Sequence, residues 1–351
     1  MYTREQTKTI RIGNTPVGGG NPVTIESMTN TDTRNAAGTI RQIEALTEAG
    51  CEIVRVAVPD AAAAESFREI KKAAKIPVIA DIHFDYRMAL AAIEAGADMI
   101  RINPGNIAGE NRVRQVADAA KAAGIPIRVG VNGGSLEKEL FEKHGGLTAE
   151  ALCESLAKHV AMLERCGFTD MLLTIKASDV PLTLAAHKIL CEKYDYPLHI
   201  GITEAGTPYR GTIKSAVGIG ALLAMGVGDT IRVSLTGDPV AEIRVCKEIL
   251  QAMGLRRFGT NIVSCPTCGR CEVDLLEMAE KVEKFCDELG AEITVAVMGC
   301  VVNGPGEARE ADFGIACGKG SGVVFRKGEI VERLPSEQLA EGLIAVIKQI
   351  R

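Results

Sequence analysis

Residues 51–82 read CEIVRVAVPDAAAAESFREIKKAAKIPVIADI. The stretch begins with a β-branched run, IVRVAV (53–58), continues with a helical pattern, and ends with a second run, VIADI (78–82). Both runs are largely apolar rather than strictly alternating, which is typical of parallel strands that helices cover. The stretch therefore predicts one strand–helix–strand unit.

The same unit recurs along most of the chain, at a spacing of roughly 30 residues. Six further runs have the character of strands: VTIESM (23–28), MIRIN (99–103), IRVGVN (127–132), MLLTIKA (171–177), LHIGIT (198–203) and TIRVSL (230–235). Helical patterns separate them, among them Thr39–Ala49, Arg87–Ala95, Arg112–Ala123 and Ala149–Cys166. Eight alternating units over about 250 residues predict an α/β fold, a (β/α)8 TIM barrel. An open doubly wound sheet is the rival, but no G-x-G-x-x-G follows the first strand.

The pattern changes near Gly259. A helix over about Val273–Leu289 is expected, followed by a strand at 293–298, short strands at DFGIAC (312–317) and GVVFRKG (322–328), and a helix from about Ser336 to Ile350. We therefore expect a barrel domain of residues 1–258 and a small α+β domain of residues 259–351.

Composition excludes several classes of protein. With 40 Lys and Arg against 45 Asp and Glu in 351 residues, the net charge of −5 excludes a generic nucleic-acid binder. The most apolar stretch, Gly218–Gly228, is too short and too Gly-rich to span a membrane, and the polar N-terminus lacks the pattern of a signal peptide. We expect a cytoplasmic protein whose eleven cysteines are reduced.

Five of the eight predicted strands carry a cation at or near the carboxyl end, where barrel active sites lie. The cations are Arg55, Arg101, Arg128, Lys176 and Arg232. Internal salt bridges with Asp81 and Glu204 would explain some of them. The excess over these two acids favours an anionic substrate with more than one phosphate charge.

Further polar residues follow the same strands. Asn132 and Ser234 are candidates to donate hydrogen bonds to the anion, and Asp81 and His83 complete the candidate substrate-binding set. Glu204, in GITEAGT, is either a partner of an arginine or a general acid beside the anion. The sequence has neither H-x-H nor H-E-x-x-H, so a zinc site in the barrel is not expected.

The small domain holds a different kind of candidate site. Cys265 and Cys268 form a C-x-x-C pair, and Cys300 leaves a strand into a Gly/Pro turn. Spacing alone predicts a metal centre on these three thiolates and leaves iron–sulfur and zinc open. Glu307, seven residues after Cys300, would add a harder oxygen ligand that binds one iron weakly and can be exchanged, which favours iron–sulfur.

Eight stretches together resemble the 4-hydroxy-3-methylbut-2-enyl diphosphate synthase family of the non-mevalonate isoprenoid pathway. They are SMTNTDT (27–33), ADIHFD (80–85), RINPGN (101–106), RVGVNGGSL (128–136), KASD (176–179), GITEAG (201–206), SCPTCGR (264–270) and MGCVVNGPGEA (298–308). The resemblance covers essentially the whole chain and is to the short bacterial form. One departure is Glu26, where the family pattern suggests Gln.

The resemblance implies a TIM barrel followed by a domain similar to modules of sulfite and nitrite reductases. That domain would hold one 4Fe–4S cluster per chain on Cys265, Cys268, Cys300 and Glu307, leaving out Cys271 and Cys317. The substrate would be 2-C-methyl-D-erythritol 2,4-cyclodiphosphate, reduced with two electrons from flavodoxin or ferredoxin. The resemblance also implies a homodimer in which the cluster domain of one subunit covers the barrel of the other.

These expectations assign roles to the residues at the strand ends. The five cations would hold the diphosphate, and Glu204 would protonate the departing hydroxyl. Two alternatives remain at this stage: a non-redox barrel enzyme acting on a phosphorylated substrate with a structural zinc, and a non-catalytic redox module. The second does not explain five cations at strand ends.

Overall fold

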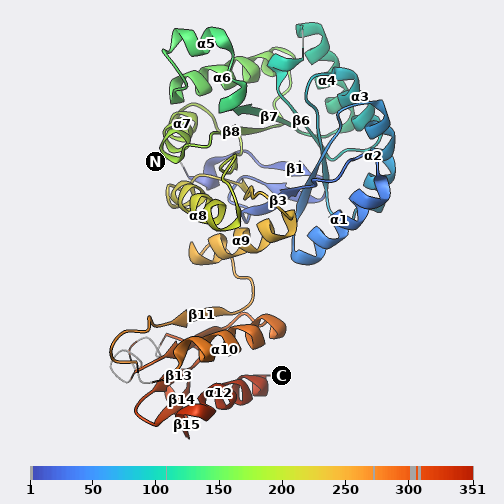
Figure 1. The fold of residues 1–351 in the computed structure, drawn as a ribbon. Helices are drawn as coiled ribbons and strands as arrows, with labels where there is room; N and C mark the ends of the chain where they lie inside the picture. The colour runs from blue at the N-terminus through green and yellow to red at the C-terminus, as the bar shows by residue number, and fades with distance from the viewer. Residues whose placement is uncertain (1–2, 108, 272, 301–305, 307–309, 351) are drawn as a thin grey trace. The chain divides into compact units, whose positions relative to one another are not determined.

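The computed structural model describes residues 3–107, 109–271, 273–300, 306 and 310–350, and the chain divides into two compact units, Met1–Arg256 and Arg257–Arg351. Figure 1 colours the two units from blue to yellow-orange and from orange to red. Each unit has its own sheet and its own buried core.

The first unit is built on eight parallel strands in the order β8-β7-β6-β5-β4-β3-β10-β9. Their bounds are β3 Thr24–Met28, β4 Ile53–Ala57, β5 Val78–Asp81, β6 Met99–Ile102, β7 Ile127–Asn132, β8 Met171–Lys176, β9 His199–Ile200 and β10 Thr230–Ile231. A parallel bridge between Leu173 and Leu198 joins the two ends of this order and closes the ring. The predicted TIM barrel is confirmed.

Helices form a continuous layer outside the ring (Figure 1). They are α1 Ala36–Ala49, α2 Ala61–Ala73, α3 Tyr86–Glu94, α4 Glu110–Ala123, α6 Ala149–Arg165, α7 Val180–Lys193, α8 Pro208–Ala224 and α9 Pro239–Ala252, with the short α5 Lys138–Lys143 before α6. Each long helix packs on the next, and α9 packs back on α1. Polar residues in the strand-to-helix loops start several helices: the side chains of Asp60 and Asp179 accept hydrogen bonds from Ala63 N and Leu182 N.

The last two barrel strands are shorter than the sequence runs suggest. Arg232 N still donates to Ile200 O at 3.1 Å, but beyond this pair the segments 201–204 and 232–235 leave the ladder. Glu204 has a φ of +53°, which extended backbone does not allow, so the chain turns there. The residues that follow β9 and β10 therefore lie in loops at the carboxyl end of the barrel.

An antiparallel hairpin, β1 Ile10–Ile12 and β2 Thr15–Val17, precedes the barrel strands. Ile10, Ile12 and Val17 form a buried cluster with side chains from the amino-terminal halves of four barrel strands: Ile53, Ile79, Met99 and Leu172. The hairpin therefore closes the amino end of the barrel, and the opposite end is left to the strand-end loops.

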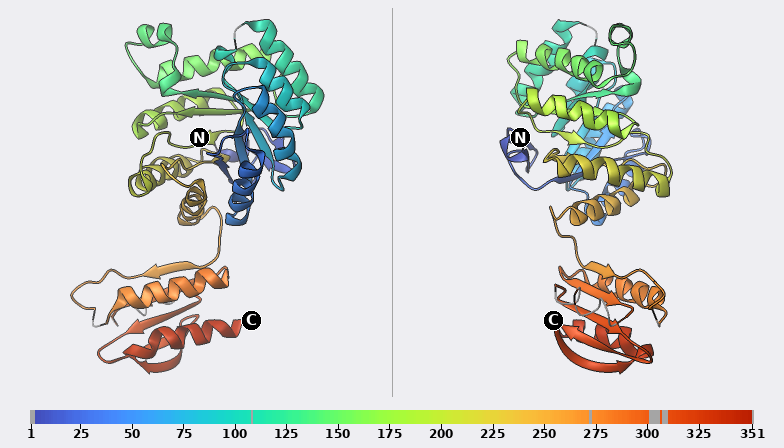
Figure 2. Two further views of the ribbon diagram at one scale, coloured as in Figure 1. Left: turned by 45° about the vertical axis from the view of Figure 1, so that its right-hand side comes forward. Right: turned by 90° about the vertical axis from the view of Figure 1, so that its left-hand side faces the viewer.

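The second unit is a five-stranded mixed sheet in the order β11-β12-β13-β14-β15. The strands are β11 Asn261–Ser264, β12 Thr294–Met298, β13 Phe313–Cys317, β14 Ser321–Arg326 and β15 Glu329–Pro335; the first three are parallel and the last two antiparallel. Two helices, α10 Leu275–Leu289 and α12 Leu339–Ile347, pack on one face of the sheet (Figure 2). The α+β character expected from the sequence is confirmed, although β11 and β15 were not foreseen.

Candidate active site

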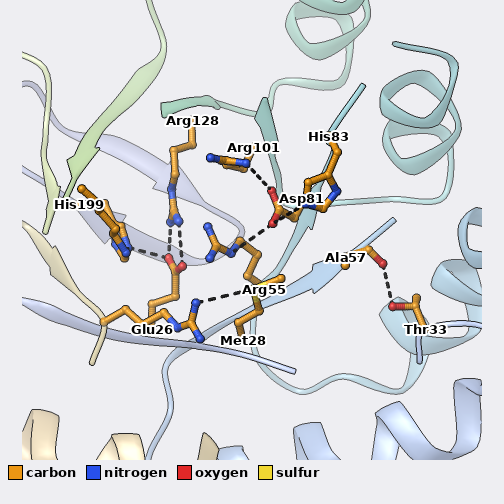
Figure 3. Close-up of polar contacts among 12 residues, drawn as sticks. Glu26, Met28, Thr33, Arg55, Ala57, Asp81, His83, Arg101, Arg128 and His199 are labelled. Atoms are coloured by element: carbon orange, nitrogen blue, oxygen red, sulfur yellow. Dashed lines mark hydrogen bonds and ion pairs between the residues drawn. The ribbon is translucent and has the colours of Figure 1, made fainter. Parts of the chain in front are cut away.

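Charged side chains from β3, β4, β5, β6, β7 and β8 lie in the interior of the barrel, and Figure 3 shows Glu26, Arg55, Asp81, Arg101 and Arg128 among them. Strand register explains part of this, because Asp81, Arg101 and Arg128 pair side by side on β5, β6 and β7. All five predicted cations are buried or nearly so. The side chains of the four arginines are between 0% (Arg128) and 16% (Arg232) exposed, and Lys176 is 6% exposed. Cations at this depth need counter-charges or a bound anion.

Arg128 lies deeper than the sequence suggested. It is the second residue of the six-residue strand β7, not a strand-end residue, and it is completely buried. Its Nη1 donates to Glu26 Oε1 at 2.8 Å and its Nη2 to Glu26 Oε2, a bidentate pair between two fully buried groups. Burial by itself raises the pKa of Glu26, but the charge and hydrogen bonds of Arg128 lower it below its usual value.

Lys176 ends β8 and contacts a histidine rather than a carboxylate. Its Nζ lies 2.8 Å from His199 Nε2, and His199 Nδ1 lies 2.7 Å from Thr230 Oγ1. Burial lowers the pKa of both Lys176 and His199 well below their usual values, and neighbouring arginines lower them further.

Asp81 is shared by two arginines. Its Oδ1 accepts from Arg101 Nη1 at 3.2 Å, and its Oδ2 lies 3.8 Å from Arg55 Nε and 3.9 Å from His83 Nε2. Burial raises the pKa of Asp81, but Arg55, Arg101 and His83 together hold it below its usual value. The Nε atoms of Arg55 and Arg101 are buried and have no hydrogen-bond partner, so both side chains retain donors for an anion.

Arg232 pairs with an acid from outside the strands. Glu242 on α9 approaches Arg232 Nε at 3.4 Å through Oε2, which also accepts from Ser27 Oγ at 3.0 Å. Glu242 is 2% exposed, so this pair is also internal.

Glu204, Asn132 and Ser234 lie toward the open end of the barrel. Glu204 is exposed in the turn after β9, while Asn132, at the end of β7, and Ser234, after β10, are half-buried. In the described structure the arginines pair with Glu26, Asp81 and Glu242, and Glu204 makes no ion pair with them. The alternative role of Glu204 as an arginine partner is therefore not realised.

The cysteines of the second unit gather at the carboxyl edge of its parallel strands. Cys265 directly follows β11, Cys300 follows β12 by two residues, and Cys317 ends β13. Gly299 N donates to Cys265 Sγ at 3.1 Å. A Cβ added at Gly299 would lie 2.6 Å from Cys271 Sγ and 3.6 Å from Cys265 Sγ, so the glycine leaves room for these sulfur atoms.

This edge has the donor chemistry of a soft metal centre. Cys265 and Cys271 lie beside Gly299, Cys268 is exposed on the same loop, and a backbone N–H donates to Cys265 Sγ. Within the described ranges no three His, Cys, Asp or Glu side chains are close enough together to hold a metal ion. Glu307, the fourth predicted ligand, lies outside the described residues.

Three residues of the barrel interior escaped sequence reasoning. His199 lies in a strand run and Glu242 in a helix, and neither position marks its residue as part of a site. Glu26 was noted as a departure from the family pattern, without a partner. Its signal was a carboxylate inside an otherwise apolar strand, which requires a buried cation nearby.

These features define a class: a TIM barrel with a cation-rich interior, followed by a small cysteine-bearing α+β domain. The GcpE TIM-barrel domain model matches residues 7–247, and the GcpE protein C-terminal domain model matches residues 261–349. The chain belongs to the GcpE family.

Curated relatives match over nearly the full length. The chain is 59% identical over 347 residues to the 4-hydroxy-3-methylbut-2-en-1-yl diphosphate synthase (flavodoxin) of Geobacter sulfurreducens, with 99% of this chain and 98% of that protein covered. It is 56% identical, with the same coverage, to the protein of the same name from Caldanaerobacter subterraneus subsp. tengcongensis.

Solved structures support the fold alone. A sialic acid synthetase from Leptospira borgpetersenii aligns with a TM-score of 0.52 at 14% identity, covering 79% of this chain and 96% of that one. A dihydropteroate synthase from Stenotrophomonas maltophilia aligns with a TM-score of 0.51 at 14% identity, covering 71% of this chain and 98% of that one.

No helix among the described residues is long and apolar enough to cross a membrane.

Proposed function

We propose that this chain is an oxidoreductase that converts 2-C-methyl-D-erythritol 2,4-cyclodiphosphate into 4-hydroxy-3-methylbut-2-enyl diphosphate. The observation that carries the proposal is that the barrel and the cysteine-bearing domain both match one family, whose curated relatives are named for this product. The structural-zinc alternative has no comparable support.

The barrel interior would bind the diphosphate. The Nε atoms of Arg55 and Arg101 have no hydrogen-bond partner, and Lys176, at the end of β8, carries an ammonium that only donates. Arg232 would add a further cation from the loop after β10, with Asn132 and Ser234 donating hydrogen bonds nearer the open end. Arg128 is bound to Glu26 deeper in the barrel and would contribute positive charge without contacting the anion.

Charge arithmetic supports an anionic ligand. Five cations, Arg55, Arg101, Arg128, Lys176 and Arg232, face three buried carboxylates, Glu26, Asp81 and Glu242, so at full ionisation two positive charges remain (5 − 3 = 2). A desolvated excess of this size is unfavourable until an anion neutralises it. A diphosphate supplies that charge, and Asp81 and His83 would orient the arginines toward it.

The second unit would hold one 4Fe–4S cluster per chain on Cys265, Cys268, Cys300 and Glu307. When bound, the cluster would supply single electrons and a Lewis-acidic iron. The N–H···S bond from Gly299 to Cys265, at the edge where Cys300 also lies, supports this assignment. Glu204 would hold the proton that the departing hydroxyl takes, because its exposed carboxyl lies on the loop at the open end of the barrel.

The proposal extends to partners and location. Flavodoxin, after which the relatives are named, would deliver the electrons, and ferredoxin is the other donor of suitable chemistry. Two chains would form a homodimer that shares the active site. A cytoplasmic location suits a protein whose eleven cysteines must stay reduced.

Ligand variants test the cluster assignment. Cys265→Ser, Cys268→Ser and Cys300→Ser should each lose iron and sulfide after anaerobic reconstitution, because a hydroxyl replaces a soft thiolate poorly. Cys271→Ser is the matched control and should keep both. Equal loss in Cys271→Ser would contradict the ligand set.

Turnover tests the function. The reconstituted protein should be brown and should convert the cyclodiphosphate when reduced flavodoxin is supplied. A colourless protein with stoichiometric zinc and no turnover would favour the non-redox alternative.

A further inference from the structure

A line of polar contacts crosses the interior of the barrel from Arg128 to Lys176. Glu26 on β3 binds both Nη atoms of Arg128, and its Oε2 lies 3.7 Å from His199 Nδ1 (Figure 3). His199 in turn contacts Lys176 Nζ through Nε2 at 2.8 Å. Glu26, Arg128 and His199 have no exposed surface, and Lys176 is 6% exposed.

The contacts couple the state of His199 to that of Lys176. Burial and the charges of Lys176 and Arg128 hold the pKa of His199 far below its usual value, so the ring is neutral. When the Lys176 amine is protonated it can only donate, so Nε2 then accepts from it and the ring proton lies on Nδ1. That proton faces Thr230 Oγ1, and the Glu26 carboxylate lies on the same side of the ring.

Lys176 has more cations than anions around it. The charged and titratable groups around its amine come from strands and from helices. They are Glu26 on β3, Arg55 on β4, Arg128 on β7, His199 on β9, Arg232 after β10, His187 on α7 and Cys246 on α9. Burial lowers the pKa of Lys176, and the arginines lower it further. In this group the only carboxylate is Glu26, which acts in the opposite direction.

We propose that Glu26 is a positioning residue for Lys176. By binding Arg128 and by lying on the Nδ1–H side of His199, it keeps the Lys176 amine protonated. The protonated amine is thereby held toward the anion in the barrel. The role of Glu26 in this contact network stands on the geometry. Only the statement that Lys176 is held toward a bound anion rests on the proposed function.

The test is the titration of Lys176 in the full chain. Lysine labelled with 13C at Cε reports its protonation by NMR, and Lys176→Arg identifies the resonance. In Glu26→Gln, which keeps the shape and one hydrogen-bonding oxygen, the titration midpoint of Lys176 should fall by about one pH unit or more. In Glu26→Asp, which keeps the charge, the midpoint should stay nearer the wild-type value.

Glu242→Gln is the matched control. It removes an equally buried carboxylate that pairs with Arg232 rather than with Arg128 or His199. Its effect on Lys176 should be smaller. An unmoved midpoint in Glu26→Gln, or equal shifts in Glu26→Gln and Glu242→Gln, would overturn the proposal.

A second variant keeps the proposal testable if Glu26→Gln fails to fold. The double variant Glu26→Gln with Arg128→Met leaves no unpaired guanidinium. Its Lys176 midpoint should still lie below the wild-type value, because the carboxylate is lost while Arg55 and Arg232 remain around the amine. A midpoint at or above the wild-type value would contradict the role of Glu26.

Binding of inorganic pyrophosphate, measured by calorimetry, separates this proposal from the proposed function. The alkaline limit of binding should move to lower pH together with the Lys176 midpoint. If the wild type binds no pyrophosphate at any pH, Lys176 is not held toward an anion, and the result also counts against the proposed function. Intact binding with an unmoved midpoint would overturn the role of Glu26 alone.

Discussion

At the scale of single residues, the ion pair between Glu26 and Arg128 dominates the barrel interior. Both side chains are fully buried and the contact is bidentate. Such a pair contributes little net stability by itself, but the loss of one partner leaves an uncompensated buried charge.

Arg128→Ala should therefore lower the free energy of unfolding by about 3–5 kcal/mol, measured by urea titration. Replacing both partners by apolar residues of similar size, Glu26→Leu with Arg128→Met, should cost less than the single change. A double variant as unstable as Arg128→Ala would show that the two residues do not act as a pair.

The same pair predicts an acid limit of stability. The pKa of Glu26 is lower in the folded chain than its ordinary value of 4.5. A carboxyl of this kind stabilises the fold above its unfolded pKa, and that contribution is lost as the pH falls through the lowered folded value. Between pH 5 and the acid transition, the free energy of unfolding should fall more steeply in the wild type than in Glu26→Gln; parallel curves would contradict this assignment.

Glu204 is the residue on which proton transfer is proposed to depend. Glu204→Gln keeps size and hydrogen bonding but removes the transferable proton, so turnover should fall by roughly 10²–10⁴ with iron content unchanged. Glu204→Asp, which retains an acid, should keep more activity than the Gln variant. Full turnover in Glu204→Gln would refute the proton-donor role.

At the scale of elements, the β1–β2 hairpin closes the amino end of the barrel. Ile12 is fully buried against the strand starts, while Arg11, its neighbour on the same strand, is exposed. Alternation along three residues thus separates a core side chain from a solvated one.

Ile12→Ala should lower the free energy of unfolding by about 2–5 kcal/mol, because it removes buried methyl groups and leaves a cavity. Arg11→Ala is the matched control and should stay within about 0.5 kcal/mol of the wild type. Urea titrations of the two variants compare them directly, and similar values would mean that the hairpin does not belong to the core.

At the scale of the whole molecule, the chain consists of two units with separate cores. A unit with its own core and closed sheet can fold alone. A fragment of residues 1–256 should therefore unfold cooperatively in urea, followed by circular dichroism, and should bind pyrophosphate. A fragment that is unfolded or inactive in binding would show that the barrel requires the second unit.

The sequence by itself determined the repeating pattern of this protein. Eight apolar runs separated by helical segments indicated the barrel, since a local period of hydrophobicity reflects which faces are covered. The sequence also predicted the cations on the strands and the metal-binding spacing of Cys265, Cys268 and Cys300. Residue type and short spacing are properties of the chain alone.

Only the tertiary structure decided which charges meet. Glu26 and Arg128 are 102 residues apart, and Asp81 and Arg101 are 20 residues apart on neighbouring strands. Barrel closure and strand register bring such residues together, and neither is encoded in any local pattern. The physical reason is that a buried carboxylate must find a counter-charge wherever the fold supplies one, so the partner of Arg128 depends on the closed barrel and not on its neighbours in sequence.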